Sequence, residues 1–417
     1  MLIFKPWYSE RVMSATIIMW IFASFALDLI PGVVIDQKNQ LFLATFCIYL
    51  FLFIACTIIN RYLYLIRPPT DTTKFNFYLN LGGLLGTILG ALLIPVIGRT
   101  IAVQHLEMVS SVLLFAVFFL LRDSQKLRNH FRSRTVLKIS LLSVIIFIGT
   151  YYFIKTKPSQ GVYIRTLYNV MRIQDEGGVR SLVNGGVTHG KQFLDETRKK
   201  MPTLYYHPRA PFANIMNVMP HGKRNVAIIG LGIGAMAYYS RPEDQWTFFE
   251  IDGDMELIAR NYFSYLSDSK ANLQVVIGDG RIKLKERPQL FDLLVIDAFS
   301  GDAVPAHLLT EESIGIYLQK LKSQKGPIVF HISNSFVNIE SVLIPTAIKM
   351  GFTYASSDRT FTDQLGQSTS HWLILSHDAG IVKKLIDEHG WIKKPLTKYM
   401  NGWTDDYISF FQPMFLK

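Results

Sequence analysis

The amino-acid sequence predicts an α-helical transmembrane region followed by an α/β protein, in which a small β-hairpin subdomain leads into a Rossmann-type sheet domain. Three observations predict this class. Long apolar stretches fill the first third of the 417 residues, and only 18% of the chain is charged, against about a quarter in a soluble domain. Short strands with paired glycines follow, and then strands alternate with helical runs. The predicted domains are 1–158, 159–223 and 224–417.

The first predicted domain contains five apolar stretches, at about residues 13–35, 41–60, 77–98, 102–121 and 137–154. Because about 20 apolar residues span a bilayer as a helix, they predict a multi-pass inner-membrane protein with the lipid bilayer as a partner. Eleven loop Lys and Arg residues fall on one side and two on the other. The positive-inside rule then places the carboxy-terminal domain outside the cytoplasm. The chemistry described below favours a cytoplasmic domain, so the side of the membrane on which this domain lies stays open.

The net charge of +11 belongs mostly to this first region. Residues 1–158 hold 15 Lys and Arg against 6 Asp and Glu, which leaves 28 against 26 for the rest. A nucleic-acid-binding domain would carry the positive charge itself, so nucleic acid is not an expected partner. The two cysteines, Cys47 and Cys56, exclude a Cys-based zinc site. No metal is expected, because four histidines show no helix-spaced pair: His189, His207, His307 and His331.

Strand and helix signals organise the remaining two-thirds. Residues 162–193 show short strands with turns at Gly177-Gly178 and Gly185-Gly186, which predicts the hairpin subdomain. Helical runs at 253–264 and 310–322 separate some of the later strands. The candidate strands from residue 225 onward are five: "NVAIIG", "WTFFEID", "LQVVIGD", "FDLLVIDAF" and "GPIVFHIS". Strands that alternate with helices predict a parallel sheet with helices on both faces.

The first of these strands ends in the glycines Gly230, Gly232 and Gly234. A strand, glycines and a helix in this order let the backbone approach a ligand at the end of strand one. A tight turn with no ligand is the alternative. The second strand ends in Glu250 and Asp252. An acid about 20 residues beyond the glycines suits a ribose diol, because a carboxylate accepts both hydroxyl protons.

The next two strands also end in acids. Asp279 and Gly280 follow the third strand, and a carboxylate there could accept a hydrogen bond from an adenine amine. Asp297 and Asp302 follow the fourth strand. Because open α/β sheets bind ligands at the carboxyl ends of their strands, this series of acids predicts a nucleoside-type ligand. A solvated acid or a helix cap is the alternative at each single position.

These motifs resemble those of the spermidine synthase (polyamine aminopropyltransferase) family, and in particular the bacterial proteins that fuse transmembrane helices to such a domain. The resemblance covers about residues 160–410. It rests on "VRSLVNGGVTHGKQF", "GLGIGA", "FFEID", "LSDS", "GDGRIKL", "FDLLVIDAFSGDAVPAHLLT" and "WTDDY". It implies a methyltransferase-like sheet domain behind an amino-terminal β-hairpin domain.

The resemblance also implies a reaction and roles for residues. An aminopropyl group would move from decarboxylated S-adenosylmethionine, or a close relative, to putrescine or a related amine, without a metal. Glu250 matches the family's ribose acid, Asp279 its adenine contact and Gln192 the glutamine of the hairpin domain. Asp297 matches the acid that deprotonates the attacking amine, and Asp302 the second acid of that loop.

Further residues are candidates for the amine itself. Tyr205 and Tyr206 could pack along its methylenes or cations, with ordinary aromatic packing as the alternative. Asp405 and Asp406 could contact the amine, or could begin a helix after Gly402. A homo-oligomer is a further expectation, because members of the family commonly oligomerise.

Two positions depart from the family pattern. Ile233 stands where aminopropyltransferases carry an acid in the glycine-rich loop, and Asp297 and Asp302 are five positions apart, farther than is usual. Both departures leave the nucleoside site intact. Two alternatives to aminopropyl transfer therefore stay open: an S-adenosylmethionine-dependent methyl- or alkyltransferase, and a non-catalytic membrane protein that binds polyamine or nucleoside.

Overall fold

The computed structural model of the protein describes residues 161–184, 187–299, 305–334, 337–359, 369–395 and 401–409, together with 77, 80–82 and 84. The chain divides into two units, Met1–Ser159 and Gln160–Lys417, and the following description concerns the second unit. The bounds of the three domains expected from the sequence stay a prediction.

The predicted multi-pass membrane localisation is contradicted by the helices of the described residues. No helix among them is both long enough and apolar enough to cross a bilayer. The longest, α14 (Ala379–His389), has 11 residues, whereas a span needs about 20. A span requires apolar character and this helical length together. The five apolar stretches lie outside the described residues, apart from 77, 80–82 and 84.

The predicted hairpin subdomain is a four-stranded antiparallel sheet in the order β1-β2-β3-β4. Its strands are β1 (Val162–Arg165), β2 (Val170–Glu176), β3 (Val179–Asn184) and β4 (Val187–Phe193). Gly177 and Gly178 join β2 to β3 with φ of 58° and 75°. Positive φ at both central residues gives the turn a twist that matches the strands, which is why glycines occupy it.

The second sheet has seven strands in the order β10-β11-β9-β8-β5-β6-β7. The five predicted strands form its parallel part: β5 (Asn225–Ile229), β6 (Gln245–Glu250), β7 (Asn272–Ile277), β8 (Leu293–Ile296) and β9 (Ile328–His331). Two strands that the sequence patterns did not predict complete it, β10 (Thr353–Arg359) and β11 (Ser370–Ser376). Strand β11 runs antiparallel to both of its neighbours. One reversed strand at this place is the methyltransferase-like arrangement that was expected.

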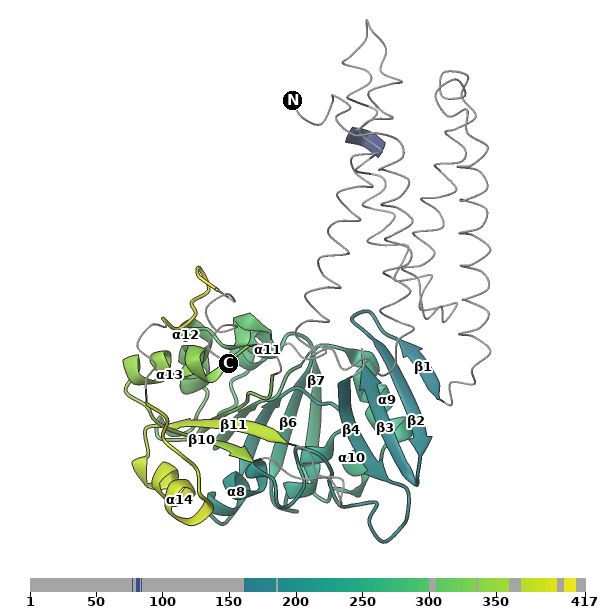
Figure 1. Ribbon diagram of the computed structural model, residues 1–417, viewed down its shortest axis with the longest axis horizontal. Coiled ribbons are helices and arrows are strands. Elements are labelled where there is room, and N and C mark those ends of the chain that lie inside the picture. Colours follow the sequence, from purple (N-terminus) through teal and green to yellow (C-terminus); the bar gives the residue numbers. More distant parts are fainter. Residues whose placement is uncertain are drawn as a thin grey trace, which may run out of the picture. The chain divides into compact units, whose positions relative to one another are not determined.

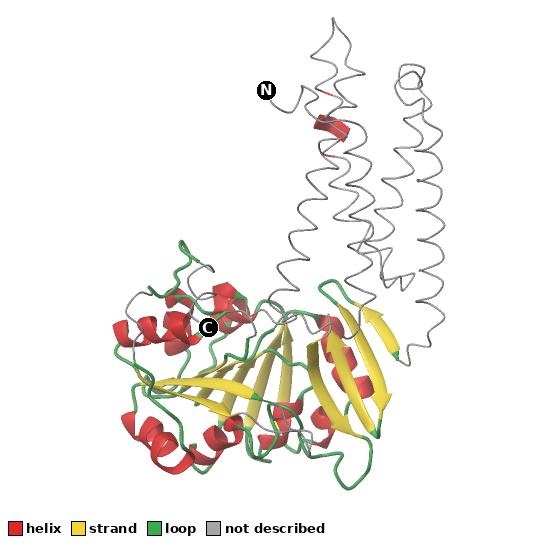
Figure 2. Cartoon of the chain, in the orientation of Figure 1, coloured by secondary structure: helices red, strands yellow, loops and turns green. Residues whose placement is uncertain are grey.

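Helices cover both faces of this sheet (Figure 2). Their bounds are α8 (Pro211–Val218), η2 (Ala235–Tyr239), α9 (Gly253–Tyr262), α10 (Tyr265–Asp268), α11 (Gly280–Glu286), η3 (Ala306–Leu308), α12 (Glu311–Gln319), α13 (Glu340–Lys349) and α14. The predicted runs 253–264 and 310–322 correspond to α9 and α12. Asp252, Asp279 and Thr310 precede α9, α11 and α12, and each side chain accepts a backbone N–H of its helix. Such caps satisfy donors that the helix itself leaves unpaired.

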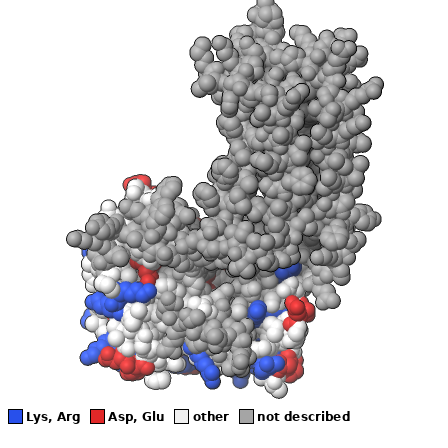
Figure 3. Space-filling view, in the orientation of Figure 1, with Lys and Arg blue, Asp and Glu red and all other residues white. Residues whose placement is uncertain are grey.

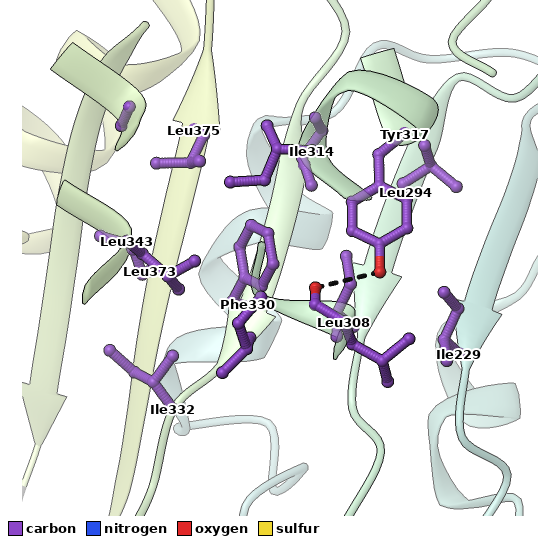
Figure 4. Close-up of a cluster of buried hydrophobic side chains, with 14 of the residues drawn as sticks. Ile229, Leu294, Leu308, Ile314, Tyr317, Phe330, Ile332, Leu343, Leu373 and Leu375 are labelled. Carbon is purple, nitrogen blue, oxygen red and sulfur yellow. Dashed lines mark hydrogen bonds between the residues drawn. The ribbon is translucent and has the colours of Figure 1, made fainter. Parts of the chain in front are cut away.

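The core lies on the two faces of the seven-stranded sheet. On β8, Leu294 and Ile296 join one buried cluster and Leu293 and Val295 the other. This alternation explains why the strand is apolar throughout, as expected of a parallel strand covered on both sides. Figure 4 shows the first cluster, in which the Tyr317 hydroxyl donates to the carbonyl oxygen of Leu308 at 3.0 Å.

The hairpin sheet packs against the second sheet's domain through a third buried cluster. The cluster combines strands β2 and β3 with helices α9 and α10 and the glycine-rich loop, and Figure 1 shows these elements together. Its residues are Met171, Ile173, Leu182, Ile233, Ala235, Met255, Ile258, Phe263 and Tyr265. On the described part of the face in Figure 3, basic and acidic side chains lie interspersed.

Two ion pairs with buried carboxylates join elements that are distant in sequence. Arg224 and Asp244 form one, with side chains only 4% and 0% exposed and an Nη2–Oδ2 distance of 2.5 Å. Glu340 on α13 forms the other, with Lys394 at 2.7 Å and His371 at 2.9 Å. Burial favours a raised pKa for Glu340, but the contacts with His371 and Lys394 outweigh it and lower the pKa to about 2.

Candidate functional site

A cavity of about 250 Å³ lies at the carboxyl ends of strands β5, β6, β7 and β8. Strand order reverses between β5 and β8, and open α/β sheets bind their ligands at such a point. Residues from β4 and from the β1–β2 connection also line the cavity. Nine of the site residues predicted from the sequence line it: Tyr205, Tyr206, Gly230, Gly232, Glu250, Asp252, Asp279, Gly280 and Asp297.

Two glycines after β5 shape the floor of the cavity in different ways. Gly230 has φ of 106°, and a Cβ there would lie 2.2 Å from the backbone oxygen of Asp297. Only glycine therefore lets the ends of β5 and β8 come this close. Gly232 has φ of 52°, and a Cβ there would meet only the His189 carbonyl oxygen, at 3.9 Å. That open space beside bare backbone is where a ligand can approach. Gly234 is the residue before η2 and does not line the cavity.

Glu250 and Asp252 lie together beside the glycine loop. The Glu250 carboxylate accepts hydrogen bonds from the backbone N–H groups of Leu231 and Asp252, each at 3.0 Å. Burial raises the pKa of Glu250, although these N–H groups act in the opposite direction. The Oδ1 atom of Asp252 caps α9, and its buried Oδ2 has no hydrogen-bond partner among the described residues. An unpaired buried acceptor suits a ligand hydroxyl, such as that of a ribose.

Asp279 is the residue before α11, and its side chain contacts a histidine. Its Oδ1 accepts from the backbone N–H of Ile282 at 2.9 Å, and its Oδ2 lies 3.0 Å from Nε2 of His307. Gly280 packs its α-carbon against Ile229, where a Cβ would come within 2.5 Å of a side-chain carbon. His307 was considered from sequence only as a metal ligand, and the structure instead places it beside the expected adenine contact.

Asp297 lies at the end of β8 with a partner for each oxygen. Its Oδ2 accepts the Tyr206 hydroxyl at 2.5 Å, and its Oδ1 lies 2.6 Å from Nδ1 of His331. The side chains of His331 and Asp297 are only 3% and 7% exposed. Burial and the adjacent Asp297 charge raise the pKa of Tyr206 well above its usual value, so this phenol stays a proton donor to the carboxylate. Tyr205 packs beside Tyr206, with ring centroids 5.9 Å apart.

His331 continues the hydrogen-bonded chain to Ser333. Its Nε2 lies 2.8 Å from the Ser333 hydroxyl oxygen, and its ring stacks on Trp372 with centroids 4.3 Å apart. Both His331 and Ser333 line the cavity. Neither residue was predicted from the sequence as part of the site. One signal was available, because His331 is the last residue of β9 and so occupies the same strand-end position as the acids.

The structure does not bring Gln192 to the cavity. Its amide nitrogen donates to the Lys199 carbonyl oxygen at 3.1 Å and to the Ser264 hydroxyl at 2.7 Å. Its amide oxygen accepts the backbone N–H of Ser264 at 3.1 Å, and the residue is buried. These bonds occupy the side chain in joining β4 to the segment before α10. Gln192 therefore holds the hairpin sheet against the larger domain.

The carboxy-terminal acids also lie apart from the cavity lining. Asp405 makes a two-point ion pair with Arg281, at 2.7 and 2.6 Å, and accepts from the Thr310 hydroxyl at 2.8 Å. The bond to Arg281 lowers the pKa of Asp405. Asp406 is exposed, and residues 401–409 form no helix, so the alternative of a helix start is wrong. Asp302, the second predicted catalytic acid, lies outside the described residues.

The strand order gives the cavity two chemically distinct ends, because β8 lies on one side of β5 whereas β6 and β7 lie on the other. Glu250, Asp252 and Asp279 offer carboxylate acceptors for hydroxyl and amine hydrogens. At the other end, Asp297 lies among the rings of Tyr205 and Tyr206, where a cation would find both a negative charge and aromatic faces. Among the described residues, no group of three His, Cys, Asp or Glu side chains is arranged to hold a metal ion.

Comparisons with known proteins identify a relative of the expected kind. No family model matches the chain. The polyamine aminopropyltransferase of Vibrio vulnificus is 34% identical over 110 residues, which are 25% of this chain and 36% of that protein. The match therefore spans about a third of the relative's length. It confirms that the chain resembles the polyamine aminopropyltransferases, which are transferases.

Solved structures show likenesses of the same kind. A probable spermidine synthase from Corynebacterium glutamicum has 15% identity and a TM-score of 0.44, covering 55% of this chain and 88% of its own. Spermidine synthase from Thermotoga maritima has 18% identity and a TM-score of 0.41, covering 61% and 84%. Because the identities and TM-scores are low, the fold assignment rests on the strand order and not on these likenesses.

Proposed function

We propose that the protein is an aminopropyltransferase that moves an aminopropyl group from decarboxylated S-adenosylmethionine to putrescine or a related amine. The observation that carries the proposal is the single cavity with two ends. Carboxylates suited to a nucleoside line one end, and a carboxylate among aromatic rings lines the other. The curated relative supports the reaction class by its name.

The nucleoside end would hold the donor by hydrogen bonds. The ribose hydroxyls would donate to Glu250 and to the unpaired Oδ2 of Asp252, and the adenine amine to Asp279 beside His307. The open space at Gly232 would let the backbone contact the donor. Each carboxylate oxygen has two acceptor sites, so the existing backbone bonds of Glu250 leave room for the ribose.

The other end would prepare the amine for attack. A polyamine is protonated at neutral pH, and its nitrogen cannot attack until it has lost a proton. Asp297 would attract the ammonium group and help remove that proton. The nitrogen lone pair then attacks the carbon bonded to the sulfonium, and the C–S electron pair passes to sulfur. The sulfonium becomes a neutral thioether, so proximity and charge placement suffice.

One observation favours a second candidate, a methyl- or alkyltransferase that uses S-adenosylmethionine. Ile233 occupies the loop position where the family carries an acid, and it is 2% exposed. A Cβ on Gly190 would come within 2.6 Å of its side chain, so Ile233 fills the interface with β4 and does not face the ligand. The loop therefore supplies no carboxylate for the donor's aminopropyl nitrogen. A methyl donor does not need one.

Product mass spectrometry on the full chain tests the proposal. Decarboxylated S-adenosylmethionine and S-adenosylmethionine are offered separately, each with a panel of amines that includes putrescine. The expected product is the amine plus one aminopropyl unit, formed about 10²–10⁴ times more slowly by Asp297→Asn, the range typical of a lost general base. Asp387→Asn, an exposed change on α14, is the matched control.

Other outcomes would reject the proposal. An added methyl group from S-adenosylmethionine alone would establish the second candidate. Donor binding without any product would indicate a binding protein that retains the fold without the reaction.

A further inference from the structure

Asp297, His331 and Ser333 form one continuous chain of hydrogen bonds along the wall of the cavity. The two distances are 2.6 Å from Asp297 Oδ1 to His331 Nδ1 and 2.8 Å from His331 Nε2 to Ser333 Oγ. A hydroxyl next to an imidazole that a carboxylate orients is the arrangement by which enzymes move a proton from a hydroxyl to a base. The order of groups thus indicates a direction for proton movement, toward the imidazole.

The neighbouring hydrogen bonds determine which atoms of Asp297, His331 and Ser333 carry the hydrogens. The Asp297 carboxylate also accepts the Tyr206 hydroxyl, so it acts as the acceptor toward His331 and places the imidazole hydrogen on Nδ1. The Ser333 oxygen accepts the backbone N–H of His371 at 2.8 Å and keeps its own hydrogen. That hydrogen can point to Nε2, which has a free lone pair in this tautomer.

We propose that the proton of the attacking amine leaves through the Ser333 hydroxyl to Nε2 of His331, while Asp297 holds the imidazole and balances its charge. This inference rests on the proposed function, and it names the final proton acceptor that the carboxylate alone does not provide. A free carboxyl group loses its proton near pH 3.9 and an imidazole near 6.5, whereas an alkylammonium holds its proton to about pH 10. The imidazole is therefore the better acceptor near neutrality.

The step balances in atoms and charge. One ammonium N–H proton passes to Ser333 Oγ as the Ser333 proton passes to Nε2, so the serine ends unchanged and His331 becomes an imidazolium beside Asp297. The neutral amine attacks the carbon next to sulfur, and the sulfonium becomes a thioether. The product nitrogen keeps its remaining hydrogens and one positive charge. The imidazolium then releases the extra proton to solvent.

Burial explains why this proton relay needs Asp297 in addition to Ser333 and His331. The His331 ring stacks on Trp372, with centroids 4.3 Å apart, and meets Phe299 edge to face, with centroids 4.9 Å apart. An imidazolium is poorly solvated there, so the Asp297 carboxylate is required to balance it. The described titratable groups that face His331 are Asp297 on β8 and the phenols of Tyr205 and Tyr206.

The test compares two variants of the full chain, each with a matched control. His331→Gln removes the acceptor, and His377→Gln removes another histidine that stacks on an aromatic ring, Phe352, with centroids 4.1 Å apart. Ser333→Ala removes the relaying hydroxyl. Ser376→Ala removes a hydroxyl that donates to the Lys325 carbonyl oxygen at 2.8 Å, remote from the cavity lining. Thermal unfolding and S-adenosylmethionine binding verify that each variant is folded.

The expected readout is the dependence of the transfer rate on pH. At pH 7, His331→Gln and Ser333→Ala are expected to be slower by about 10²–10⁴, and the controls are expected to match the unaltered protein. The deficit should shrink toward pH 10, because the amine then arrives already neutral. Ser333→Thr, which keeps a hydroxyl, should recover much of the rate. A purely structural role would instead give a deficit independent of pH.

Two results would overturn the relay. Near-normal rates at pH 7 in both relay variants, alongside an inactive Asp297→Asn, would mean that the carboxylate acts alone. The second result is independent of activity and of the proposed function: nitrogen NMR of the histidine-labelled protein should show the hydrogen of neutral His331 on Nδ1. Finding it on Nε2 would contradict the proposed direction. If the unaltered protein makes no transfer product, the proposed function fails separately from this assignment of the hydrogen.

Discussion

The glycine loop after β5 allows a prediction that separates a folding effect from a binding effect. Gly232 and Gly177 have almost the same positive φ, 52° and 58°. An added Cβ would meet no atom within 4 Å at Gly177 and only one, at 3.9 Å, at Gly232. Gly232 lines the cavity, whereas Gly177 lies in the β2–β3 turn. Alanine at each position therefore makes a matched pair.

The expected folding cost is the same for both variants. A left-handed conformation costs a residue with a Cβ about 1–2 kcal/mol, and neither site adds a steric clash. For a domain of this size, 1 kcal/mol lowers Tm by about 2–4 °C. Both Gly232→Ala and Gly177→Ala should thus lower Tm by roughly 2–8 °C.

The expected binding effects differ. A methyl group at Gly232 would occupy space that the donor needs, and overpacking of this kind costs about 1–3 kcal/mol. That penalty corresponds to an increase in Kd of about 5- to 150-fold. Gly177→Ala should bind as the unaltered protein does. Calorimetric titration with S-adenosylmethionine measures both, and thermal unfolding gives the folding cost independently. If Gly232→Ala binds within twofold of normal, the donor does not contact this loop.

Three further changes probe the ion pairs. The pKa of Glu340 is lowered to about 2, so its contribution of about 3 kcal/mol to the free energy of unfolding is present above pH 4.5 and is lost as the pH falls toward 2. Urea unfolding of Glu340→Gln should therefore show no such loss of stability at low pH. A variant with the same pH dependence as the unaltered protein would contradict this prediction. Arg224→Ala should cost about 3–5 kcal/mol in urea unfolding, because it leaves the Asp244 charge buried and unpaired, and a cost below 1 kcal/mol would refute this. Asp405→Asn should cost less than about 1 kcal/mol by the same measurement, since its pair with Arg281 is partly exposed, and a larger loss would show a wider role for the pair.

The acids of the nucleoside end could be found from sequence because strand position decides their location. An apolar run such as "FDLLVIDAF" predicts a buried parallel strand, and the residue after it must lie at the carboxyl edge of the sheet. Glu250 ends β6, and Asp279 and Asp297 come shortly after β7 and β8, so their common edge was predictable. The glycines between β5 and η2 were predictable for the same reason.

Side-chain partners were decided by the tertiary structure. Tyr206 precedes Asp297 by 91 residues, and only the packing of the segment before α8 brings its hydroxyl to the carboxylate. Gln192 had the family's position but bonds to Ser264 and away from the cavity lining. A residue's distance along the chain carries no information about such contacts, since they depend on how whole elements pack.

The ends of the five parallel strands were therefore determined by the sequence alone, through the pattern of its apolar residues. The tertiary structure decided what each strand-end group bonds to. His331 shows both sides: its place at the end of β9 follows from the run "GPIVFH", whereas its link from Asp297 to Ser333 depends on β8 and β9 lying side by side. Local hydrophobic patterns specify elements, and hydrogen-bond partners across elements appear only when the sheet and its loops are assembled.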